Sequence, residues 1–231
     1  MTCGSPNTSE SCPRRWLVKQ QALQESLQHQ PLLLVVRPGS GDLEAPFTPS
    51  PLFAQIQRLY SVGLRHLEVA WCQHPGWKGF VGCLQDHCPE LQLGAASVTS
   101  SEALPQLVEL GLDYAMSPCW QPELVAEARS LDVLLVPGVF SPTEVLQAKS
   151  FGCGMVKLFP AAELGADYWS RLRSPLGELP FVIAAGGLSL QDIPLWLKAG
   201  HGAVALGRRV IGSDANCDEL RRWLELASTN R

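Results

Sequence analysis

The 231-residue chain has few charged side chains and no long apolar run. Charged residues make up only 17% of it, the net charge is −4, and no basic stripe is present, so nucleic acid is not an expected partner. No apolar run approaches the roughly 18 residues that a membrane span needs. Residues 1–13 are polar and lack the apolar core of a secretory signal, and we interpret them as a flexible N-terminal segment. We therefore expect a cytoplasmic protein with no membrane partner.

Paired cysteine spacings are also missing. The eight cysteines form no CxxC motif, whereas zinc sites and disulfide frameworks usually show such spacings. We therefore expect free thiols, no metal site and no disulfide. What the chain does have is apolar residues, at 46% of the sequence, which at this length can bury a full core.

A repeated pattern runs through the chain: a helical stretch, a glycine, two or three residues and then a short apolar segment. The glycines of these units are Gly63, Gly111, Gly152 and Gly200. Glycine just past a helix end is typical of the left-handed C′ position, and the apolar segment after it is typical of a parallel strand buried on both faces. The gaps of 48, 41 and 48 residues leave room for another unit between each pair.

Counting the intermediate units gives eight strands, each followed by a helix. We expect the strands over residues 32–36, 67–70, 91–94, 114–116, 133–136, 155–159, 181–184 and 203–206. The spacing of roughly 24 residues fits an α/β fold, a (β/α)8 TIM barrel, as a single domain over residues 14–231. An extra N-terminal helix over residues 14–30 should close the bottom of the barrel. A doubly wound open sheet is the alternative, but no GxGxxG motif follows the first strand.

Two charged residues interrupt the apolar strands, Glu68 in the second and Lys157 in the sixth. Burying an ammonium group without a partner is costly, and burial lowers the pKa of a lysine and makes its amine a candidate nucleophile. A salt bridge between the two residues is one interpretation. Schiff-base chemistry, with an amine that attacks a ketone and a carboxylate that moves protons, is the other.

Other polar or glycine residues follow the strands at the carboxyl ends, where TIM barrels hold their sites. They are Arg37, Ser97, Ser117, Gly186, Gly187, Gly207 and Arg208. The glycines could bring N–H groups to an anion at the helix that opens near Ser189, or could serve only tight turns. The Pro- and Gly-rich loop over residues 38–51 is either a lid or an inert insertion.

The segment Val156-Lys157-Leu158-Phe159-Pro160-Ala161 resembles the Schiff-base signature of the 2-keto-3-deoxy-6-phosphogluconate / 4-hydroxy-2-oxoglutarate (KDPG/KHG) aldolase family. Further blocks fall in the order of that family, at residues 36–37, 67–69, 94–98, 117–118, 137–139 and 142–144. Together they cover the chain from about residue 31 to residue 211. Six blocks in register make the resemblance specific, although each block alone is weak.

The resemblance implies a class I aldolase, a carbon–carbon lyase of carbohydrate metabolism that splits a 4-hydroxy-2-oxo acid into pyruvate and an aldehyde. It implies that Lys157 forms the imine and that Glu68 is the acid/base, acting through water. Arg37 and Ser97 would hold the pyruvate carboxylate, and Pro118 would pack beside the imine. It further implies no cofactor or metal, a small oxo acid as substrate, and a homotrimer.

For the far end of the substrate, the resemblance implies that Gly186, Gly187 and Gly207 present N–H groups to a phosphate or carboxylate. Arg208, where a small residue is usual, could bind such a group bidentately or fill the pocket. Two other departures from the family are Cys72, where some members carry an arginine, and Ala185, where threonine is usual.

These departures leave alternatives open. Oxaloacetate decarboxylation needs only the same lysine and the same imine chemistry. A divergent barrel that binds an oxo acid or phosphate without turnover is a second alternative. Phosphate-binding isomerases or synthases of the tryptophan or thiamine type are a third, although they do not need a lysine followed by Leu158-Phe159-Pro160.

Overall fold

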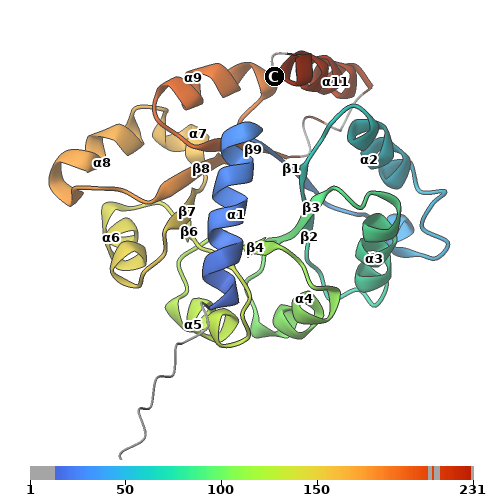
Figure 1. The fold of residues 1–231 in the computed structure, drawn as a ribbon, viewed down its shortest axis with the longest axis horizontal. Helices are drawn as coiled ribbons and strands as arrows, with labels where there is room; N and C mark the ends of the chain where they lie inside the picture. The colour runs from blue at the N-terminus through green and yellow to red at the C-terminus, as the bar shows by residue number, and fades with distance from the viewer. Residues whose placement is uncertain (1–13, 208–209, 211–213, 230–231) are drawn as a thin grey trace, which may run out of the picture.

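The computed structural model describes residues 14–207, 210 and 214–229 of the chain. Its strands are β1 Leu32–Val36, β2 His66–Ala70, β3 Gln92–Ala96, β4 Tyr114–Met116, β5 Leu135–Val136, β6 Gly138–Val139, β7 Met155–Leu158, β8 Phe181–Ala185 and β9 Ala203–Leu206. They form one sheet in the order β5-β4-β3-β2-β1-β9-β8-β7-β6, and the pairs in it are parallel. The sheet curves into a nearly closed barrel inside a ring of helices (Figure 1), which confirms the predicted TIM barrel.

The fifth expected strand, over residues 133–136, is shorter than predicted, and a further short strand follows it. β5 pairs with β4 through Leu135, and β6 pairs with β7 through Gly138. Pro137 lies between them and has no N–H to contribute to a ladder. The prediction did not include the strand after Pro137, and the described residues form nine strands where eight were expected.

The helices alternate with the strands and surround the barrel. They are α1 Arg15–His29, α2 Pro51–Ser61, α3 Trp77–His87, α4 Leu104–Leu110, α5 Pro122–Ser130, α6 Pro142–Ser150, α7 Ala161–Leu164, α8 Tyr168–Leu176, α9 Ile193–Lys198 and α11 Asp214–Thr229, with short 3-10 helices η1 Ser40–Leu43, η2 Ser101–Ala103 and η3 Leu190–Asp192. The four glycines of the repeat all have positive φ angles, between 60° and 104°, as the C′ position requires. Among the described helices, none has both the length and the apolar character to cross a membrane.

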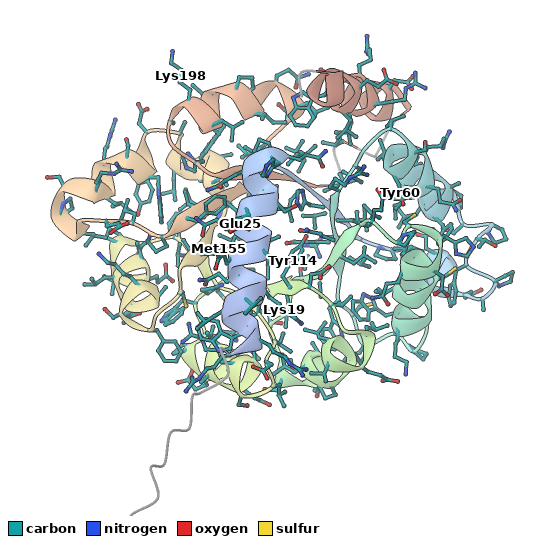
Figure 2. The ribbon with its side chains drawn as sticks, in the orientation of Figure 1. Lys19, Glu25, Tyr60, Tyr114, Met155 and Lys198 are labelled. Atoms are coloured by element: carbon teal, nitrogen blue, oxygen red, sulfur yellow. The ribbon has the colours of Figure 1, made fainter. Side chains whose placement is uncertain are left out.

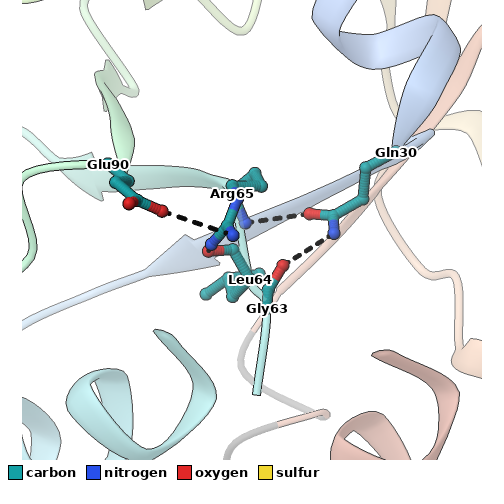
Figure 3. Close-up of polar contacts among 5 residues, drawn as sticks. All are labelled: Gln30, Gly63, Leu64, Arg65 and Glu90. Atoms are coloured by element: carbon teal, nitrogen blue, oxygen red, sulfur yellow. Dashed lines mark hydrogen bonds and ion pairs between the residues drawn. The ribbon is translucent and has the colours of Figure 1, made fainter. Parts of the chain in front are cut away.

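Helix α1 covers the amino ends of the strands (Figure 1), as the sequence predicts. Its Leu23 and Leu27 are buried against the barrel interior. Gln30, directly after the helix, donates from Nε2 to the carbonyl of Gly63 at 2.8 Å and accepts from the backbone N–H of Arg65 at 2.9 Å (Figure 3). These bonds fix α1 to the turn that leads into β2.

Two apolar cores hold the fold together. The inner core fills the barrel with side chains from alternate strand positions, among them Leu33, Met155 and Ile183, together with Leu23 and Leu27 of α1. The outer core lies between the sheet and the helices and is the larger of the two. Each fully buried aliphatic side chain contributes roughly 1.5–3 kcal/mol to folding, so the outer core dominates the stability of the fold.

The Pro- and Gly-rich loop over residues 38–51 is folded onto the barrel. It contains η1, and Leu43 within it is buried. Ser50 accepts from the Phe53 N–H to cap α2, and its hydroxyl donates to Asp42 Oδ1 at 2.5 Å. These contacts favour the structural insertion over the lid. The predicted flexible segment at residues 1–13 lies outside the described residues.

Candidate active site

A cavity of about 280 Å3 opens at the carboxyl ends of the strands. Its lining includes eight of the nine site residues predicted from the sequence: Arg37, Glu68, Ser97, Pro118, Lys157, Gly186, Gly187 and Gly207. The ninth, Arg208, lies outside the described residues. Residues spread over 170 positions of sequence are therefore brought to one end of the barrel.

Lys157 on β7 and Glu68 on β2 are the buried charged residues of this cavity. Lys157 is 6% exposed and Glu68 is 1% exposed. The ion pairs among the described residues lie at the surface, and none of them includes Lys157 or Glu68. Among the described residues, no direct salt bridge therefore joins Lys157 to Glu68, and the two charges interact across the cavity.

Burial shifts the pKa values of both groups toward neutrality. It raises the pKa of Glu68 from 4.5 to about 7, although Lys157 and Arg37 oppose the rise. It lowers the pKa of Lys157, and the charge of Arg37 adds to that effect while Glu68 opposes it. The lowered pKa of Lys157 favours the free amine, which can attack a carbonyl, and a pKa of about 7 lets Glu68 donate a proton as the uncharged acid.

Arg37 and Ser97 form a polar edge on the cavity. Arg37 follows β1 and donates from Nη2 to Ser97 Oγ at 2.9 Å. Ser97 follows β3 and has a φ angle of 60°, a left-handed conformation that is uncommon outside glycine and is often found at functional sites. A guanidinium group at this position can bind a carboxylate through two parallel N–H donors.

Pro118 is held at the cavity by a tight turn after β4. Ser117, which also appeared in the sequence as a polar strand end, donates from its hydroxyl to the Cys119 carbonyl at 2.6 Å. It also accepts from the Gly138 N–H at 3.3 Å. A Cβ atom at Gly138 would lie 2.3 Å from the Pro118 carbonyl carbon, so only glycine permits this approach. Ser117 therefore positions the turn.

The two glycines after β8 are packed closely against the segment after β7. Gly186 has a φ angle of 94°, and a Cβ atom there would come within 3.0 Å of the Phe159 ring. At Gly187, φ is 80° and a Cβ atom would lie 2.7 Å from the Cβ of Ala162. The turn therefore requires glycine on steric grounds, which is the simpler of the two explanations considered from the sequence.

The expected helix near Ser189 differs from a free anion site. It begins with the three-residue η3, and the Ser189 N–H donates to the Asp192 carboxylate at 2.8 Å. The Asp192 carboxylate thus occupies the N–H of Ser189, as in a capping box.

Several apolar lining residues were not predicted from the sequence: Val35, Ala96, Phe159, Leu188 and Ala205. The ring of Phe159 lies with its centroid 5.7 Å from Lys157 Nζ. The alternation of side chains along a strand could have identified part of this set. Val35, Phe159 and Ala205 each lie two positions from a residue that was predicted.

Neither Cys72 nor a cluster of metal-ligating side chains adds to the cavity in the described part of the chain. Cys72, a departure noted in the sequence, is half-buried against the outer core and does not line the cavity. In residues 14–207, 210 and 214–229, no group of three or more His, Cys, Asp or Glu side chains is placed to hold a metal ion.

Comparison with known proteins agrees with this geometry. A family model described as "Aldolase: KDPG and KHG aldolase" matches residues 50–223. The chain is similar to the 2-dehydro-3-deoxy-6-phosphogalactonate aldolase of Escherichia coli K12, with 24% identity over 69% of this chain and 78% of that protein. It is also similar to the 2-dehydro-3-deoxy-phosphogluconate aldolase of Treponema pallidum, with 32% identity over 49% of this chain and 54% of that protein.

A solved structure shares the fold. The KDPG aldolase of Legionella pneumophila, with pyruvate captured at low pH as a covalent carbinolamine intermediate, aligns with a TM-score of 0.69 and 20% identity. The alignment covers 85% of this chain and 93% of that chain. At this identity the similarity concerns the fold.

Proposed function

The chain belongs to the KDPG and KHG aldolase family, a family of carbon–carbon lyases, and we propose that it cleaves a 4-hydroxy-2-oxo acid to pyruvate and an aldehyde by class I chemistry. KDPG and 4-hydroxy-2-oxoglutarate are the substrates to test first. The observation that carries the proposal is Lys157, buried without an ion pair among the described residues and facing Glu68 across the cavity.

In the proposed mechanism, the neutral amine of Lys157 attacks the C2 carbonyl of the oxo acid to give a carbinolamine. Loss of water, with a proton supplied by Glu68, gives the protonated imine. Glu68, now a carboxylate, removes the proton of the C4 hydroxyl, directly or through water, as the C3–C4 bond breaks. The bonding electrons pass into the imine, the aldehyde leaves, and the resulting enamine takes a proton at C3 from Glu68, directly or through water. Addition of water then releases pyruvate and restores the amine.

The remaining lining residues would hold the substrate. We assign Arg37 and Ser97 to the pyruvate carboxylate, because their side chains meet at 2.9 Å on one edge of the cavity. Pro118 would pack beside the imine. The backbone N–H groups of Gly186, Gly187 and Gly207 would bind the distal phosphate or carboxylate, and Arg208 would add a cation there.

Reduction with borohydride in the presence of pyruvate tests the central step. We expect a pyruvyl adduct on Lys157 by peptide mass spectrometry, and no adduct in the Lys157→Met variant. Lys198→Met, which removes an exposed lysine of α9, should react like the unchanged protein. If pyruvate labels another lysine, or none, the Schiff-base assignment is wrong.

Product analysis separates the aldolase from its alternatives. Turnover of either 4-hydroxy-2-oxo acid with release of pyruvate supports the aldolase. Adduct formation with turnover of oxaloacetate alone would identify a decarboxylase, and an adduct without any turnover would identify a binding protein. We further propose a cytoplasmic homotrimer that needs no metal; light scattering and assays after chelation test the trimer and the metal independence.

A further inference from the structure

Tyr114 places a phenol inside the barrel that the proposed mechanism does not use. It lies on β4, is 1% exposed, and belongs to the inner core (Figure 2). Its hydroxyl is buried and has no hydrogen-bond partner among the described residues. A buried hydroxyl without a partner is costly, so a polar group at this position calls for an explanation.

The strand register places Tyr114 in one row with Glu68. Glu68 on β2 is aligned with Gly94 on β3, and Gly94 is aligned with Tyr114 on β4. Aligned residues of neighbouring parallel strands point to the same side of the sheet. The three residues therefore face the barrel interior side by side, with glycine in the middle.

Gly94 lets the tyrosine ring reach across β3. A Cβ atom at Gly94 would lie 2.4 Å from Cε2 and 2.6 Å from Cζ of Tyr114, so the ring occupies the place of the missing side chain. The hydroxyl is attached at Cζ, at the far end of a ring that leans from β4 over β3. The phenol is therefore directed toward β2, the strand that carries Glu68.

The carboxylate of Glu68 has a matching unfilled acceptor. Its Oε1 is buried and accepts no hydrogen bond from the described residues. Burial raises the pKa of Tyr114 well above its usual value, and the charges of Glu68 and Asp113 add to the rise. The phenol therefore stays protonated and can act only as a donor to a carboxylate.

We propose that Tyr114 is a positioning residue whose phenol O–H donates to the ionised carboxylate of Glu68 and orients it toward the substrate. The role in orientation rests on the proposed aldolase function. The hydrogen bond itself does not, because it needs only the ionised acid. A donor to the carboxylate stabilises the charged form and so opposes the effect of burial on Glu68.

The described groups that act on Glu68 come from three sides. Lys157 faces it from β7, Arg37 from the end of β1 and Tyr114 from β4. Asp113 acts on the phenol from the preceding position, and Lys19 of α1 donates to the Leu112 carbonyl beyond it. Lys157 and Arg37 are unchanged in a Tyr114 variant, so a change in the Glu68 titration reports on the phenol.

The test replaces Tyr114 by phenylalanine, which removes one oxygen and keeps the ring. In protein labelled with 13C at the glutamate carboxyl carbon, the Glu68 signal is followed by NMR as a function of pH in the unchanged protein, Tyr114→Phe and Tyr168→Phe. Tyr168 is the control because its hydroxyl donates to the Phe140 carbonyl at 2.9 Å, outside the cavity lining. We expect the Glu68 pKa to rise by about one pH unit in Tyr114→Phe and to stay unchanged in Tyr168→Phe.

A second measurement keeps the proposal testable if Tyr114→Phe does not fold. In protein labelled at the tyrosine Cζ atoms, the Tyr114 signal should shift as Glu68 ionises, and Glu68→Gln should abolish that shift. The proposal is overturned if the Glu68 titration is unchanged in folded Tyr114→Phe, or if the Tyr114 signal does not shift as Glu68 ionises. Failure of the pyruvate adduct on Lys157 would instead overturn the proposed function, and both NMR results would still decide the role of Tyr114.

Discussion

Glu68→Gln should make the stability of the protein less dependent on pH. Burial raises the pKa of Glu68 from 4.5 in an unfolded chain to about 7 in the folded protein. A group with a raised folded pKa favours folding while it is protonated, and this contribution is lost as the pH rises through the folded pKa. Glutamine cannot ionise, so the variant does not lose this stability as the pH rises.

The size of the effect follows from the two pKa values. At about 1.4 kcal/mol for each pH unit, the interval between 4.5 and about 7 corresponds to roughly 3 kcal/mol of unfolding free energy. Stability relative to the variant should be highest below pH 4.5 and should fall until the pH passes 7. The unfolding free energy of the variant, relative to that of the unchanged protein, should therefore increase by roughly 3 kcal/mol between pH 4.5 and pH 8.

Urea unfolding at fixed chain concentration measures this difference at pH 5, 6, 7 and 8. The coupled lysine complicates the single variant, because Lys157 loses an interaction when Glu68 becomes neutral. The same comparison is therefore made in a Lys157→Met background, which removes the cation that most strongly opposes the rise in the Glu68 pKa. There the gain of the glutamine variant should be larger and should extend to higher pH.

A stability difference between the two proteins that stays constant from pH 5 to pH 8 would refute the argument. It would mean that Glu68 has the same pKa in the folded and unfolded chains, so that burial does not perturb it. A difference that grows in the opposite direction would mean that the carboxylate, and not the acid, is the form that the fold favours.

Two further variants test the geometry around the cavity. Arg37→Ala should raise KM for the oxo acid roughly 10- to 100-fold, the range expected for a lost hydrogen bond to a charged group. Arg171→Ala, at the surface, should leave KM unchanged. An unchanged KM in Arg37→Ala would contradict carboxylate binding by Arg37. Gly94→Ala should lower the unfolding free energy by about 1–3 kcal/mol in thermal or urea unfolding, because the new methyl overlaps the buried Tyr114 ring. In Gly82→Ala in α3, where a Cβ atom would make only ordinary contacts, the unfolding free energy should rise by up to about 1 kcal/mol. Equal effects at both glycines would contradict the close packing at Gly94.

The barrel was predictable because its local signals agree with one another. Glycines with positive φ end the helices, Ser141 forms a capping box with Glu144 at α6, and each following apolar run is a buried strand. Once the strands are ordered as a barrel, charged residues that face inward near the carboxyl ends of the strands point at the same cavity. Lys157 and Glu68 could be brought together on that basis, although 89 positions separate them in the chain.

Contacts between side chains were not predictable in the same way. The additional strand β6 depends on the pairing of Gly138 and Val139 with β7 beyond Pro137, and local apolarity does not reveal that pairing. The approach of Tyr114 to Glu68 depends on the register of three strands and on the absence of a side chain at Gly94. Such pairings and approaches arise only once the sheet has formed, and no periodicity in the sequence predicts them.

The shifted pKa values of Glu68 and Lys157 also depend on the opposite end of the barrel, where α1 covers the amino ends of the strands. Met155 lies two positions before Lys157 on β7 and is buried with Leu33 and with Leu23 and Leu27 of α1. This apolar layer excludes water from below, and the desolvation that shifts both pKa values requires that exclusion. Helix α1 thus contributes to the chemistry without contacting the cavity, because opening the barrel floor to water would return the lysine and the glutamate toward their ordinary charged forms.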